Sequence, residues 1–253
     1  MNARDNGFLG NLPSMQRPCL PDVFCWTKIG AEAGQTLEDI IRRKEFERIA
    51  GNGRFGWGIG NALGDSPRLA MAAVPQGRLK VVFSTMKSPP KPQDVNPTQI
   101  CVWTKYQLPS GEIRPLDQTM LITSRYSEKK TCHYALICSS PESLLSPSNI
   151  CELPSKMLRN FISNKPVGAS QVTSVVSCRS EVEESFKGDY PVTFTADLDS
   201  PGYVRLVSPV VVEGALYSVY RDFSRQVEYS KWASCMASIW MLIEERIESP
   251  RVN

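Results

Sequence analysis

The sequence predicts an α+β protein with a strongly curved β-sheet or small barrel flanked by helices. About seven to nine segments are rich in β-branched and aromatic residues, whereas only two have strong helical patterns. The strands and helices do not alternate regularly, which disfavours a doubly wound parallel sheet. A chain of 253 residues can bury a sizeable core as one domain or as two small ones.

The N-terminal part of the sequence predicts an extended arm, then a strand and a helix. Residues 1–22 are rich in Gly, Pro and Asn and predict an extended N-terminal arm, and residues 23–30, VFCWTKIG, predict a strand. A helix is expected after Thr36, a good N-cap, and should stop at Gly51-Asn52-Gly53. One face of this helix is charged, which predicts a solvated surface or a contact with phosphate; its basic residues are Arg42, Arg43, Lys44 and Arg48.

The string RFGWGIGNAL, residues 54–63, follows the helix and places Phe55 and Trp57 among three glycines. We expect a glycine-rich turn here. Its rings either line a slot for a ligand, with the glycines letting the main chain approach closely, or cover the glycines as ordinary packing.

The rest of the chain supplies more strands and one long helix. Further strands are expected at 77–88, 99–108, 119–126, 129–140, 171–180, 190–198 and 202–220, and loop with short helix at 141–163. The last segment repeats apolar residues at steps of 3, 4 and 7, which predicts a helix of about 24 residues. Its apolar face is expected to pack as core and consists of Tyr229, Trp232, Ala233, Met236, Trp240, Ile243 and Ile247.

Composition bounds the function classes. The net charge of +3 permits nucleic-acid binding without requiring it. No apolar run reaches the length of a membrane span, and the N-terminus lacks the apolar core of a signal peptide. We therefore expect a cytoplasmic protein that does not contact a membrane.

The eight cysteines form no CxxC pair, so we expect small buried hydrophobes rather than a zinc site or disulfides. His133 is the only histidine and is expected to pack in a strand. No GxSxG, Walker or HExxH pattern is present, so we assign no catalytic residue, metal or cofactor.

The order of motifs in the first half resembles the EVE domain of the PUA-like superfamily, which is related to YTH and ASCH modules. The matching residues are Trp26, Thr36-Leu37-Glu38-Asp39, Trp57-Gly58-Ile59-Gly60-Asn61 and Val82-Phe83-Ser84-Thr85. The family usually has Asp-Gly after the tryptophan and Arg before the asparagine, where this chain has Gly58 and Gly60. The resemblance covers residues 23–140, the expected EVE/PUA-like core. Residues 1–22 are expected to form an arm, and residues 141–253, which have no counterpart in the family, a β-rich extension with the C-terminal helix that packs on the same core.

The resemblance implies a non-enzymatic reader that accepts a flipped, modified base of DNA or RNA in an aromatic pocket, as in restriction or defence systems or in RNA modification. Stacking on an aromatic wall and hydrogen bonds to the base edge must offset the cost of flipping. The expected base-binding residues are Trp57, Asn61, Gly58, Gly60, Trp26, Thr27, Ser84, Thr85 and Trp103. The expected phosphate-binding residues are Lys28, Lys87, Arg125, Lys129, Lys130, Arg42 and Arg43.

Two alternatives remain open at this stage. The first is an enzyme on the same scaffold that acts on a nucleoside or nucleotide, with Lys28 or Lys87 beside Glu38 or Asp39. The second is a non-catalytic subunit whose C-terminal helix docks on a partner protein or forms a homo-oligomer. Exposed apolar surface on residues 229–247 would favour the second alternative.

Overall fold

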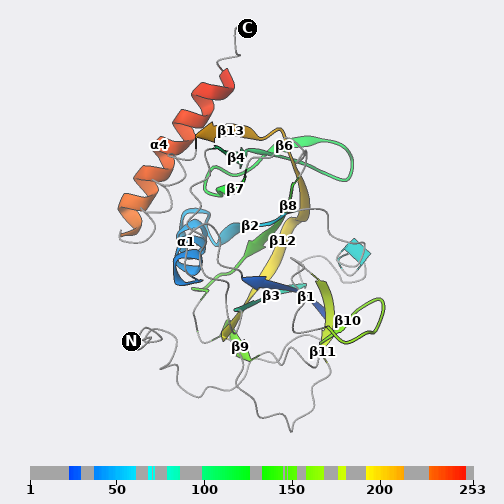
Figure 1. Ribbon diagram of the computed structural model, residues 1–253. Coiled ribbons are helices and arrows are strands. Elements are labelled where there is room, and N and C mark those ends of the chain that lie inside the picture. The colour runs from blue at the N-terminus through cyan, green and yellow to red at the C-terminus, as the bar shows by residue number, and fades with distance from the viewer. Residues whose placement is uncertain are drawn as a thin grey trace, which may run out of the picture.

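The fold is α+β, with two long helices and a strand-rich mixed sheet that is open (Figure 1). The computed structural model describes residues 23–29, 37–60, 68–69, 71, 79–85, 99–125, 133–144, 146, 148–152, 158–167, 176–180, 192–213 and 228–248. The expected α+β class is confirmed. The arm at 1–22 lies outside these residues.

The elements that the structure describes are two helices and thirteen strands. The helices are α1 (Leu37–Ala50) and α4 (Tyr229–Glu248). The strands are β1 (Val23–Ile29), β2 (Arg54–Gly60), β3 (Lys80–Thr85), β4 (Gln99–Trp103), β5 (Lys105–Gln107), β6 (Ile113–Pro115), β7 (Ile122–Arg125), β8 (His133–Ser139), β9 (Ile150–Glu152), β10 (Leu158–Asn160), β11 (Val176–Ser180), β12 (Val192–Val207) and β13 (Val210–Glu213).

The larger sheet has ten strands, with β10-β11-β1-β3-β12-β5-β6 as its main order. β8 and β9 pair with the other edge of β12, and β2 pairs with β8. β1 and β3 are parallel, while the other pairs in this sheet are antiparallel. Since β12 lies between β3 and β8, the second half of the chain contributes a strand to the same sheet as β1, β2, β3 and β8 from the first half.

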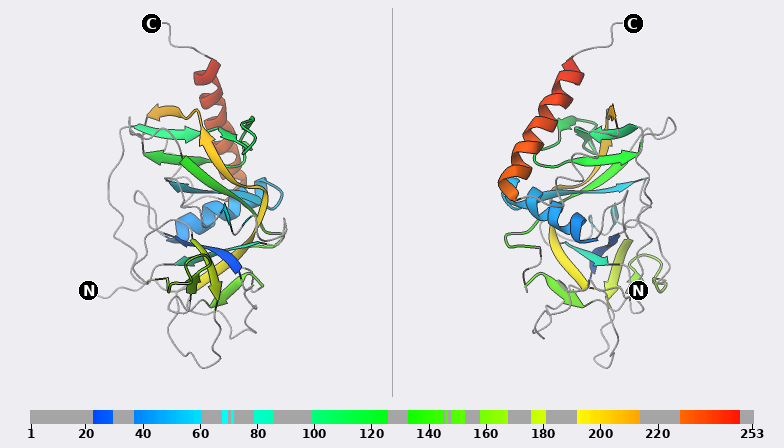
Figure 2. Two further views of the ribbon diagram at one scale, coloured as in Figure 1. Left: turned by 90° about the vertical axis from the view of Figure 1, so that its right-hand side faces the viewer. Right: turned by 60° about the vertical axis from the view of Figure 1, so that its left-hand side comes forward.

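β12 is a single strand of 16 residues, where the sequence had indicated two strands. Its first half pairs with β3 and its second half with β8 and β5. The register against β8 shifts between Leu198 and Tyr203. An irregularity of this kind bends a strand, which lets β12 continue from one end of the sheet to the other (Figure 2).

β13, β4 and β7 form a smaller, three-stranded sheet. α4 covers one face of this sheet, and the other face packs on β8 and β12 (Figure 1). The alternation in β4 shows why: Ile100 and Val102 join the cluster under α4, while Cys101 and Trp103 join the cluster above β8 and β12. A strand with both faces covered must be apolar on both, as QICVW is.

The expected turn at GWGIGN is wrong, because residues 54–60 form β2, antiparallel to β8. α1 does stop where expected: the amide of Gly53 donates to the carbonyl of Arg48 at 2.8 Å, and Asn52 and Gly53 have φ of 50° and 93°. Alternation along β2 then points Phe55, Trp57 and Ile59 toward one cluster. The intervening glycines face the smaller sheet.

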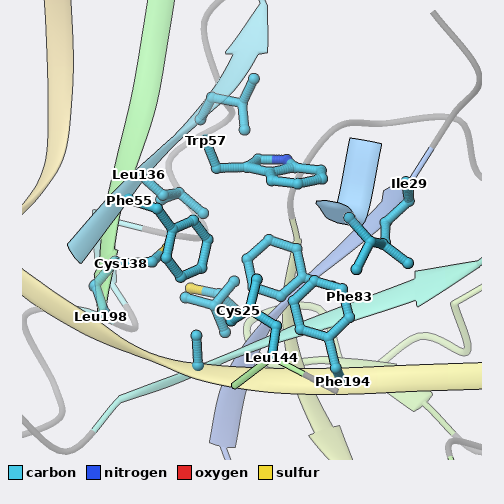
Figure 3. Close-up of a cluster of buried hydrophobic side chains, with 14 of the residues drawn as sticks. Cys25, Ile29, Phe55, Trp57, Phe83, Leu136, Cys138, Leu144, Phe194 and Leu198 are labelled. Atoms are coloured by element: carbon cyan, nitrogen blue, oxygen red, sulfur yellow. The ribbon is translucent and has the colours of Figure 1, made fainter. Parts of the chain in front are cut away.

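The main hydrophobic cluster lies between β2 and β8 on one side and β1, β3 and β12 on the other, with α1 closing it (Figure 3). Phe83 is at its centre, stacked on Phe194 at 4.7 Å between ring centroids and in edge contact with Trp57. This cluster joins residues from both halves of the chain, so we expect the halves to unfold together.

Three other elements differ from the sequence expectation. Residues 99–108 are divided at Thr104 into β4 and β5, which belong to different sheets. The described part of 141–163 contains the short strands β9 and β10. In α4, Ile247 is 44% exposed rather than buried, because the end of the helix runs past β13 (Figure 1).

Neither described helix combines the length and apolarity that a membrane crossing requires.

Candidate functional site

The three tryptophans expected to form a slot lie in three different clusters. Trp57 belongs to the main cluster, Trp103 to the cluster between the two sheets, and Trp26 to a cluster on the far face of β1 and β3. Their exposed fractions are 8%, 0% and 2%. Since no two of them share a cluster, the structure does not bring these rings together as opposite walls of one pocket.

Trp57 is held by its neighbours rather than open to solvent. Its ring contacts Phe83 with 4.8 Å between centroids and 64° between planes, and Ile29 lies beside it (Figure 3). The Lys44 ammonium lies 6.0 Å from the centre of the indole. At this distance a cation gains modestly from the ring face. In this conformation the indole is therefore a core side chain.

The main chain nevertheless brings several expected site residues to one end of the sheet. β1 and β3 run parallel in a register that pairs Lys28 with Ser84 and Ile29 with Thr85. Trp57 meets this end through Ile29 and Phe83. Carboxyl ends of adjacent parallel strands are a common location for ligands, because the chain leaves the sheet there in loops. The side chains of Lys28 and Thr85 and all of Asn61 and Lys87 lie outside the described residues.

Two expected base-binding residues bind each other. The Trp26 indole N–H donates to the Ser84 hydroxyl at 2.8 Å, and both side chains are buried. Thr27, between them in the register, is 1% exposed. This hydrogen bond fixes β1 on β3 from the face opposite Trp57. Ser84 and Trp26 therefore hold β1 and β3 together on the opposite face of the sheet and do not face the candidate site.

The charged face of α1 is neither fully solvated nor free for phosphate, because part of it is buried against β2. Lys44 and Glu47 are 4% and 0% exposed and form an ion pair of 2.8 Å. The Lys44 ammonium also donates to the Gly56 carbonyl at 2.5 Å, and the Gly56 amide donates to Glu47. Burial lowers the pKa of Lys44 and raises that of Glu47, with the opposite charges acting against burial.

This pair replaces a neighbouring strand for β2. Within the described residues β2 pairs only with β8, so its other edge would present an unpaired amide and carbonyl. Lys44 and Glu47 bind both groups of Gly56 with side chains instead. Sequence reasoning missed this role, although the signal was present: a Lys-x-x-Glu spacing places both side chains on one helix face.

The expected phosphate contacts do not form one described surface. Arg43 is 8% exposed and Arg42 is half-buried, both on α1. Arg125 ends β7, where it pairs with Ile100, and its side chain is outside the described residues. Lys129 and Lys130 are also outside.

The glycines of β2 make room for protein side chains. A Cβ built on Gly56 would lie 3.0 Å from Cδ1 of Ile122, and one on Gly58 would lie 3.0 Å from Cγ2 of the same residue. Gly60 pairs with Tyr134 beyond a register shift. Because Ile122 belongs to β7, Gly56 and Gly58 let the smaller sheet pack closely on β2.

Within the described residues, the thiols of Cys25 and Cys138 and the ring of His133 are buried, and no cluster that could hold a metal ion is found. Burial raises the pKa of Cys25 to about 12 and also raises that of Cys138, so these thiols stay protonated. His133 is 5% exposed and stacks on Trp103 at 5.6 Å. Within the described ranges, no three His, Cys, Asp or Glu side chains gather as a metal ion would need.

A groove of about 370 Å³ lies between α4, the end of α1 and the 118–119 turn. It is lined mainly by apolar side chains, including Trp232, Met236 and Trp240. Gln118 donates to Glu244 across its rim at 2.6 Å. None of the expected base-binding residues lines this groove.

Comparison with known proteins gives no match. No family model, no curated protein and no solved structure matches the chain.

Proposed function

We propose that the protein is a nucleic-acid-binding reader that accepts a flipped, modified base of DNA or RNA beside Trp57. The observation that carries the proposal is the meeting of Trp57 with the carboxyl ends of β1 and β3. At these ends the register pairs Ile29 with Thr85, which are far apart in the sequence. Asn61 follows β2 directly and would read the edge of the base.

The position of Trp57 sets an energetic condition on this function. Its indole is 8% exposed, so a base stacks on it only after the side chains that cover the ring move aside. Stacking contributes about 1–3 kcal/mol per base. Flipping itself costs a few kcal/mol. The site therefore needs hydrogen bonds to the base edge as well as stacking, and discriminates through them.

Binding to a panel of oligonucleotides, each carrying one modified base, tests the proposal by tryptophan fluorescence. We expect one modification to bind at least tenfold more tightly than the unmodified strand. Trp57→Phe retains an apolar ring in the core but reduces stacking area, and should remove most of this preference. Trp103→Phe is the matched control, because that ring is also buried but belongs to another cluster.

Three results would contradict the proposal. The first is binding that depends on salt but not on modification, which reports only a basic surface. The second is an equal loss in the Trp57 and Trp103 variants, which would indicate general destabilisation. The third is turnover of a nucleoside or nucleotide, which would favour the enzyme alternative.

A further inference from the structure

α4 has two contrasting faces. Its inward face is buried on the β13-β4-β7 sheet through Trp232, Met236, Ile239, Trp240 and Ile243. Its outward face points away from the body of the protein (Figure 2). A helix that only covered a sheet would be expected to carry charged residues on this face.

The outward face has small residues near the start of the helix, and further along it exposes Met241 and Leu242 beside the charged Glu244, Glu245 and Glu248. Ser230, Ser234 and Ser238 are exposed and follow one another at steps of four. The hydroxyls of Ser234 and Ser238 donate to the carbonyls four residues earlier, each at 3.1 Å, which satisfies them within the helix. Met241 and Leu242 come next and are 58% and 46% exposed.

A shallow hollow lies on the serine-rich first half of this outward face. It is lined by Ser230, Lys231, Ser234, Cys235 and Ser238. Four of these residues, at positions 231, 234, 235 and 238, have the i, i+3, i+4, i+7 spacing of the hole that receives one side chain from a facing helix. The face thus carries both a hole and, one to two turns away, a large side chain of the kind that fills such holes.

We propose that α4 pairs with α4 of a second copy of this chain, antiparallel, with the two helices crossing at Ser238. In this register residue 242 of one copy is level with residue 234 of the other. Leu242 then enters the hole between Lys231, Ser234, Cys235 and Ser238 of the second copy. Met241 lies level with Cys235 in the same way.

The charges favour the same register. Lys231 and Glu245 are both exposed and lie equally far from Ser238 on either side. Antiparallel pairing therefore sets Lys231 of each copy opposite Glu245 of the other. A parallel pair in register would instead place Glu245 against Glu245 and Leu242 against Leu242, and would leave both hollows empty. α4 lies along one side of the protein body, so a second α4 can approach its outward face (Figure 2).

Sedimentation velocity of the full chain between 1 and ~200 µM tests the pairing. A contact made by one helix from each copy is small, and small interfaces are weak, so we expect a shift from 28.2 kDa toward twice that mass over this range. Leu242→Asp should weaken self-association at least tenfold. Its helix content and thermal midpoint should stay near those of the parent, because Leu242 is outside the buried face. A chain that stays monomeric at the highest concentration overturns the proposal.

Exchanging the charges at positions 231 and 245 tests whether a dimer has this antiparallel register. Lys231→Glu and Glu245→Lys should each weaken association, and the double variant should restore it. A dimer that ignores both single changes, or that the double variant fails to restore, overturns the antiparallel register.

A cross-link provides a second geometric test in a Cys235→Ser background. Ser238→Cys should cross-link between copies with a short bis-maleimide, because each Ser238 faces its counterpart across helices about 8–10 Å apart. Ser230→Cys is the matched control, since the two copies of this position would be about 24 Å apart along the helix. Equal cross-linking at both positions, or none at Ser238, overturns the proposal.

Discussion

Replacing Lys44 with methionine would leave the Glu47 carboxylate buried without the Lys44 ammonium and remove a hydrogen bond from the Gly56 carbonyl. Both side chains are almost fully enclosed, and the pair distance is 2.8 Å. Removing one partner of a buried pair costs about 3–5 kcal/mol. Since domains have only about 5–15 kcal/mol of stability, we expect Lys44→Met to lower the free energy of unfolding by a large fraction.

The double variant Lys44→Met/Glu47→Leu distinguishes the charge from the edge contacts. It removes both charges of this pair, so its remaining cost comes from the unpaired amide and carbonyl of Gly56, about 1–3 kcal/mol each, and from the loss of the Glu47 charge near Arg43. The two single changes should therefore cost more in sum than the double variant. We expect this coupling to be about 2 kcal/mol, within the range for residues in direct contact.

Urea unfolding followed by circular dichroism measures all four corners of this cycle. Arg48→Gln is a matched control, because Arg48 and Glu45 form an ion pair of the same spacing on the same helix but retain 14% and 21% side-chain exposure. It should cost less than Lys44→Met, because the Arg48–Glu45 pair keeps contact with water. A cost below about 1 kcal/mol for Lys44→Met, or strict additivity in the cycle, would refute the assignment of the pair to the edge of β2.

Three further outcomes follow from the packing and the pKa shifts. Gly56→Ala should cost about 1–3 kcal/mol because its Cβ would lie 3.0 Å from Ile122, and Ile122→Val should recover part of this loss, as measured by urea unfolding. Burial raises the pKa of Glu45, but hydrogen bonds from an arginine and a backbone amide outweigh it, so the pKa is lowered from 4.5. The ionised Glu45 carboxylate stabilises the fold fully above pH 4.5, and this stabilisation is lost as the pH falls through the lower pKa of the folded state. Glu45→Gln should flatten that part of a curve of unfolding free energy against pH. An unchanged curve would contradict this prediction. In the native protein at pH 8, Cys25 should resist iodoacetamide while the half-buried Cys235 reacts, as mass mapping of peptides would report; equal labelling would contradict the burial.

Local signals along the chain predicted much of the fold. The β-branched run at 23–29, the glycine stop after α1 and the apolar period of α4 each depend on residues close in sequence. These signals also place Cys25, Cys101 and Cys138 in the core, whereas Cys235 is half-buried. The GWGIGN segment shows where this approach fails: glycine density suggests a turn, but β8 supplies a ladder of hydrogen bonds from more than 70 residues away.

The candidate site depended even more on distant contacts. A sequence shows that Trp26, Trp57 and Trp103 are large and aromatic, but the face each one occupies depends on strand register. A shift of one residue would exchange the clusters they join. Lys44, which binds the Gly56 carbonyl, comes from α1, and Ile122, which fills the space beside Gly56, comes from β7.

By itself the sequence determined the α+β class, the two long helices and the apolar strands, because helix and strand periodicity are properties of neighbouring residues. The tertiary structure decided that β12 is the central strand, that the glycines of β2 accommodate Ile122, and that Lys44 and Glu47 close an edge. It also decided that α4 leaves Met241 and Leu242 uncovered. These properties come from pairings between distant segments, and their energies depend on burial that no local pattern contains.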